Sequence, residues 1–83
     1  MQKLRITPLD KKGLSEESLL DPLITGFRRI MRTGNNQVIV AVKGSAYILF
    51  VEKSSLGLDK WYARMLNEDG EIVMICDFDT FDL

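Results

Sequence analysis

The sequence predicts an α+β fold in which one main amphipathic helix packs on a mostly antiparallel sheet, in the order β-α-β-β-β-β. Two observations support this fold class. Residues 23–31 place apolar side chains at the spacing of one helical stripe, and four later segments are rich in β-branched and aromatic residues and separated by turn residues. The chain has 83 residues without a linker or an internal repeat, which predicts a single small domain over residues 1–83.

The N-terminal third predicts a short strand followed by the helix. Apolar and polar residues alternate over 3–7, as in a half-buried edge strand. The segment 15–18 resembles a helix opening, but Asp21 followed by Pro22 is the stronger start signal, because aspartate suits the N-cap and proline the first helical position. Gly34 is placed to end the helix in a left-handed conformation.

The remaining residues predict four consecutive strands. The apolar runs 37–42 and 46–51 are separated by a short glycine-containing segment, which is typical of a hairpin. Two further strands are expected over 61–66 and 71–76, joined by a turn at 67–70 that ends in glycine. Strands that follow one another through short turns predict a meander of neighbouring antiparallel strands.

The strands carry more apolar side chains than one helix can cover. A helix of about 12 residues is about 18 Å long and covers one sheet face at most. The other face therefore needs a cover, which is either a strongly curled sheet, a segment of the same chain such as Leu56, Leu58, Phe78 and Phe81, or another protein chain. We expect another chain, most simply a second copy on a two-fold axis. The residues expected at this interface are Ile39, Ala41, Tyr47, Leu49, Val51, Val73 and Ile75.

The composition argues against most catalytic chemistry. The chain has no histidine and one cysteine, so it cannot use a Ser-His-Asp or Cys-His mechanism. Cys76 lies in an apolar run, which predicts a buried and unreactive thiol. No glycine-rich phosphate-binding motif and no nucleophile elbow occurs. We therefore expect no enzyme, no cofactor and no metal. A metal-dependent enzyme that uses Asp77, Asp79 and Asp82 is the less favoured alternative.

Basic side chains provide a second alternative, a nucleic-acid or anion contact. Aromatic residues beside basic ones are typical of single-stranded nucleic-acid binders, although the sequence pI near 5.3 argues against this class. The residues that would make this contact are Arg28, Arg29, Arg32, Lys60 and Arg64.

The two ends of the chain bear on its location and partners. The N-terminus lacks the apolar core of a signal peptide, and the uncharged stretches, including 33–42 and 44–51, are too short to span a membrane. We therefore expect a cytoplasmic protein without membrane contact. The acidic and aromatic segment 77–83 is typical either of a packed terminus or of a peptide ligand for a partner's basic, apolar groove.

Taken together, the residues predict a small non-catalytic interaction or regulatory module that self-associates or binds another protein. Its size is typical of modules encoded by bacteria and their phages. No motif in the chain is specific enough to assign it to a protein family.

Overall fold

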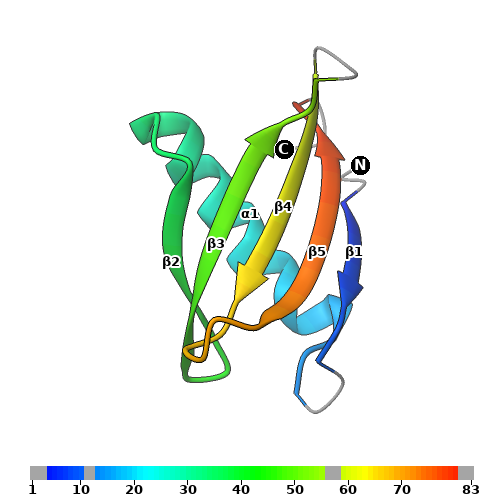
Figure 1. Cartoon of the computed structure of the whole chain (residues 1–83), viewed down its shortest axis with the longest axis vertical. Coiled ribbons are helices and arrows are strands. Elements are labelled where there is room, and N and C mark those ends of the chain that lie inside the picture. The colour runs from blue at the N-terminus through cyan, green and yellow to red at the C-terminus, as the bar shows by residue number, and fades with distance from the viewer. Residues whose placement is uncertain (1–3, 11–12, 56–58, 81–83) are drawn as a thin grey trace.

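The structure confirms the predicted fold class and element order. The computed structural model describes residues 4–10, 13–55 and 59–80. Their elements are β1 (Arg5–Pro8), α1 (Glu16–Thr33), β2 (Gln37–Val42), β3 (Ser45–Lys53), β4 (Lys60–Leu66) and β5 (Ile72–Asp79). The strands form one antiparallel sheet in the order β1-β5-β4-β3-β2. Helix α1 runs across one face of this sheet and lies behind the strands in Figure 1, so the face toward the viewer is the one without the helix.

Helix α1 begins at Glu16 with Ser15 as its N-cap, and the prediction that it begins at Asp21 was wrong. The Ser15 hydroxyl accepts a hydrogen bond from the Ser18 backbone N–H at 3.2 Å, and the Ser15 backbone N–H donates to the Ser18 hydroxyl at 3.0 Å. This reciprocal pair satisfies two N–H groups that a helix start otherwise leaves without partners. Pro22 therefore lies inside the helix rather than at its first position. The predicted end is confirmed, because Gly34 has φ +79° and its N–H donates to the Ile30 carbonyl at 2.9 Å.

The core lies between α1 and the sheet face that it covers. Phe27 and Phe78 are fully buried, and their rings stack with centroids 4.2 Å apart. Gly26 marks the closest approach of the helix, because a Cβ atom there would lie 2.7 Å from Leu49 Cδ2 and 3.0 Å from Val40 Cγ1. The other fully buried side chains of this layer are Leu19, Leu23, Leu49, Met65 and Met74.

Two tight turns and one bulge set which side chains face the helix. The β2–β3 hairpin turns on two residues, Lys43 and Gly44, both with positive φ, so Ser45 already belongs to β3. The predicted turn at 67–70 is also present, with Gly70 at φ +80°. A register shift next to Leu66 inserts an extra residue in β5, so that Val73 and Met74 are both buried.

Candidate protein interface on the exposed sheet face

The register divides the predicted interface residues between the two faces of the sheet. Leu49, Val51 and Val73 are at most 4% exposed and belong to the core under α1, so their prediction as outward-facing residues was wrong. Tyr47 is half-buried and packs against the same core. The remaining three residues of the predicted set are exposed: Ile39, Ala41 and Ile75.

The cause of this error is the register of the strands. The two-residue turn pairs Ile39 with Ile48, so the face that carries Ile39 continues through Ile48 rather than through Leu49. The bulge in β5 then moves Val73 to the helix side, while Ile75 stays outside. A two-residue turn at Lys43 and Gly44 predicts from the sequence alone that Ile48 lies on the same face as Ile39. No sequence signal marks the bulge.

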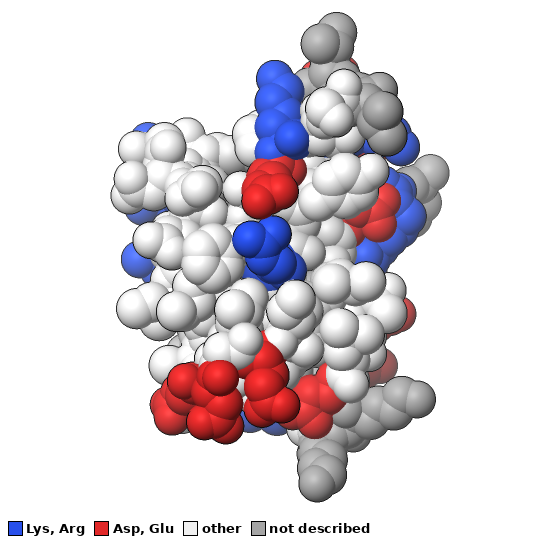
Figure 2. Space-filling model, viewed as in Figure 1, with Lys and Arg blue, Asp and Glu red and all other residues white. Residues whose placement is uncertain are grey.

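The face away from α1, which we call the outer face, carries a cluster of large apolar side chains. Their exposed fractions range from 39% for Ile48 to 65% for Ile39. We call this cluster the outer patch; its members are Ile39, Ile48, Tyr62, Ile72 and Ile75. In Figure 2 most of the surface on this side is neither acidic nor basic, and no described segment of the chain lies over the strands. Five large apolar side chains exposed on one face are unusual on a protein that acts alone in water.

Four charged side chains in the middle of the outer face form two pairs. Arg64 Nη1 lies 3.3 Å from Glu52 Oε1, and the Arg64 guanidinium lies over the Phe50 ring, 5.3 Å from its centre. Arg5 Nε donates to Asp77 Oδ2 at 2.5 Å. Each pair contributes little stability because it is exposed, but it leaves the middle of the face close to neutral. A neutral centre does not select an anionic or cationic ligand.

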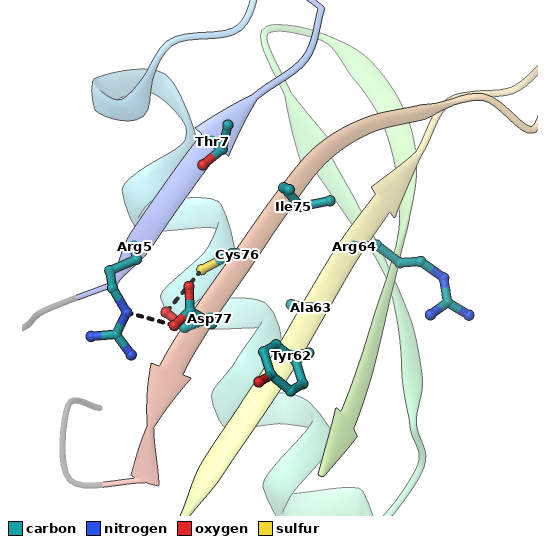
Figure 3. A pocket seen from close by; sticks show the side chains of 8 residues that line it. All are labelled: Arg5, Thr7, Tyr62, Ala63, Arg64, Ile75, Cys76 and Asp77. Carbon is teal, nitrogen blue, oxygen red and sulfur yellow. Dashed lines mark hydrogen bonds and ion pairs between the residues drawn. The ribbon is translucent and has the colours of Figure 1, made fainter. Parts of the chain in front are cut away.

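A shallow hollow of about 340 Å³ lies on the outer face between β1, β5 and β4. Thr7, Tyr62, Arg64, Ile75 and Asp77 line it from the outer face, while the buried Ala63 and Cys76 belong to the core on the helix side. In Figure 3 the Arg64 side chain points away from the other lining residues, toward β3, while Arg5 points toward Asp77. The full lining is Arg5, Thr7, Tyr62, Ala63, Arg64, Ile75, Cys76 and Asp77.

Cys76 does not give this hollow a nucleophile. The residue is 4% exposed, and burial, with a smaller contribution from the Asp77 carboxylate, raises the pKa of its thiol to about 12. A thiol with this pKa is protonated at neutral pH and reacts slowly. The Sγ atom lies 3.8 Å from the Asp77 carbonyl, to which it donates a weak hydrogen bond. The prediction that Cys76 is buried is confirmed.

The basic residues predicted for nucleic acid do not share one surface. Arg28, Arg29 and Arg32 are exposed on the last turns of α1, whereas Arg64 lies on the opposite side of the sheet. Lys60 is exposed at the start of β4. The neighbouring Trp61 faces the core, where its Nε1–H donates to Thr80 Oγ1 at 2.9 Å and its ring packs against Phe78, so it is no free stacking surface.

The described acidic residues near the C-terminus, Asp77 and Asp79, do not form a metal-binding cluster. Asp77 is paired with Arg5, and Phe78, between Asp77 and Asp79, is fully buried on the helix side. Phe78 therefore cannot cover the outer face. Asp82 and Phe81, like Leu56 and Leu58, lie outside the described residues. In the parts of the chain that the structure describes, no three His, Cys, Asp or Glu side chains are grouped to hold a metal ion.

Among the described residues, no helix combines the length and the apolar character needed to cross a membrane. The comparisons with known proteins give no relative for this chain: no family model, no curated protein and no solved structure matches it.

Proposed function

We propose that this chain is a small non-catalytic interaction module that forms a homodimer through its outer face. The observation that carries the proposal is the outer patch, in which five large apolar side chains are 39–65% exposed on one side of the sheet. Covering such side chains with protein removes apolar surface from water, which is the main favourable contribution to association.

The size of the outer face suits a stable dimer. The molecule measures 34 × 24 × 20 Å, and Figure 1 looks down the shortest of these axes onto the sheet, so the face spans the two longer ones. A rounded surface of these dimensions covers on the order of 600 Å², which is the lower end of what each partner buries in a standard interface. A larger partner would find no additional flat apolar surface on this side.

A second copy is the partner that the chemistry of the face favours. Two antiparallel sheets pack face to face in β-sandwiches, with their inner apolar side chains interdigitated. Within one copy, Arg64 is neutralised by Glu52 and Arg5 by Asp77. The middles of two such faces therefore meet without a large net charge between them. The buried thiol, and the arginines held by carboxylates, support a binding role over a catalytic one.

The test replaces one outer-patch side chain by a charge. Ile75→Glu places a carboxylate in the middle of the outer face, where Ile75 pairs with Arg64 across the sheet. We expect this variant to keep the circular dichroism spectrum of the wild type and to sediment as a monomer at concentrations where the wild type is a dimer. The neighbouring Arg64 is already paired with Glu52, so burial of the added carboxylate in an apolar interface costs several kcal/mol, which is enough to dissociate the dimer.

Met31→Glu is the matched control, because Met31 is 39% exposed but lies on α1, away from the outer face. It introduces the same charge in place of a comparable apolar side chain. We expect it to sediment like the wild type. If Met31→Glu dissociates the dimer and Ile75→Glu does not, the interface lies on the helix side, and the proposal is contradicted.

A further inference from the structure

The two ends of the outer face differ in charge. At one end, the β4–β5 turn carries three exposed carboxylates, those of Glu68, Asp69 and Glu71. The adjacent β2–β3 turn carries one exposed lysine, Lys43. The opposite end is close to neutral on the outer face: Lys60 pairs across the strands with the part-exposed Asp79, and Lys53 alternates with the buried Val51 and so lies on the helix side. Figure 2 shows the acidic side chains gathered at the lower end of the visible face. Since the middle of the face is neutral, this difference runs along the strands.

This difference distinguishes the two ways in which two-fold symmetry can stack identical faces. An axis that runs along the strands brings like ends together, so the acidic turns of both copies meet. An axis that runs across the strands reverses one copy and brings the acidic turn of each over the end of the other that carries Lys60. Like charges opposed at an interface cost affinity, while opposite charges fix its register. The reversed arrangement is therefore the favoured one.

The strand order identifies which side chains would meet. β4 is the third of the five strands, so an axis across the strands places β4 over β4 of the second copy in the reverse direction. Lys60 begins β4, and Glu68 and Asp69 follow its end. Lys60 alternates with Tyr62 and therefore belongs to the outer face.

We propose that two copies stack through their outer faces with their strands reversed, so that Lys60 of each copy lies against Glu68 and Asp69 of the other. This inference rests on the proposed self-association and adds its orientation. It assigns Lys60 and the acidic turn as the side chains that fix the register of the dimer, while the outer patch supplies its apolar contact.

Charge reversal tests the orientation. Three variants are compared by sedimentation equilibrium in low salt: Lys60→Glu, the pair Glu68→Lys with Asp69→Lys, and the combination of all three changes in one chain. In the reversed arrangement the first two oppose like charges, so we expect the dimer dissociation constant to rise about tenfold for each. The combined variant opposes unlike charges again, and we expect it to return to the wild-type value. Added salt should reduce the differences, because it screens exposed charges.

The outcomes separate the orientation from the self-association. If the wild type is a dimer and Lys60→Glu leaves its dissociation constant unchanged, the orientation is wrong and the apolar contact stands. If the combined variant stays as weak as the separate ones, the orientation is also wrong. If the wild type is monomeric, both proposals fail. A zero-length carbodiimide cross-link between Lys60 of one copy and Glu68 or Asp69 of an isotopically labelled second copy supports the orientation independently, and cross-links only between other residues contradict it.

Discussion

Gly26 is the residue on which the contact between helix and sheet depends most directly. A Cβ atom at this position would lie 2.7 Å from Leu49 Cδ2, and Leu49 is fully buried and has little room to move. Alanine favours a helix over glycine by about 1 kcal/mol, but overpacking a filled core costs about 1–3 kcal/mol. We therefore expect Gly26→Ala to lower the free energy of unfolding by about 1 kcal/mol in urea titrations.

Gly13→Ala is the control for this prediction, because nothing lies within 4 Å of a Cβ atom at Gly13. We expect this variant to change the free energy of unfolding by less than about 0.5 kcal/mol. A Gly26→Ala variant more stable than the wild type would show that helix propensity outweighs the close contact.

Cys76 makes the stability of the protein sensitive to alkaline pH. Its pKa is raised from an ordinary value of 9.0 to about 12 in the folded state, so between these values the unfolded thiol ionises while the folded thiol keeps its proton. The folded state then binds more protons, and the free energy of unfolding falls as pH rises through this window, by at most about 1.4 kcal/mol per pH unit.

The comparison that isolates this effect is Cys76→Ala, which lacks the titrating group. Urea titrations at about pH 8 and about pH 10 should show a larger loss of stability for the wild type than for the variant. Equal losses would mean that the thiol ionises as easily in the folded protein as in the unfolded one.

At the scale of elements, the start of α1 shows where local sequence signals mislead. Asp21 and Pro22 together have the composition of a helix start, yet the Ser15–Ser18 hydrogen bonds begin the helix earlier. An earlier start lets Leu19 join the buried stripe, and it is fully buried against the core. Tertiary burial of one more apolar turn outweighs the cost of a proline inside the helix.

Two substitutions distinguish these helix starts. Ser15→Ala removes the capping hydroxyl, and we expect it to lower the free energy of unfolding by about 1 kcal/mol. Asp21→Ala removes a carboxylate that caps nothing in the structure, and we expect a change below about 0.5 kcal/mol. Chemical denaturation of both variants gives the comparison. A larger loss for Asp21→Ala would restore the helix start that the sequence indicated.

The sheet shows which structural features the sequence patterns predict and which they do not. The order of the strands followed from their β-branched runs and turn residues, and the exposure of Ile39, Ala41 and Ile75 followed from the shortage of helix to cover them. The assignment of Leu49 and Val73 to the same surface failed, because which face a residue takes depends on register and bulges. Those features arise from pairing between strands and leave only weak traces in a single sequence.

For the whole molecule, the division of β3 between a core face and an outer face gives a matched pair of predictions. Val51 is 4% exposed under α1, whereas Ile48 is 39% exposed on the outer face. We expect Val51→Glu to lose about 3–5 kcal/mol, because it leaves an uncompensated charge in the core. Ile48→Glu, measured in dilute solution, should lose about 1 kcal/mol or less. Thermal unfolding followed by circular dichroism compares the two, and a folded Val51→Glu variant would contradict the register.

The proposed self-association is tested most directly by the absolute mass of the protein in solution. Light scattering on a sizing column, at two protein concentrations and two salt concentrations, measures this mass without any variant. Because the outer patch is apolar, we expect a mass of about 19 kDa, twice the 9.5 kDa of one chain, at the higher protein concentration in both salts. A mass of 9.5 kDa under every condition would mean that the outer face stays open to water, and it would contradict the proposed dimer.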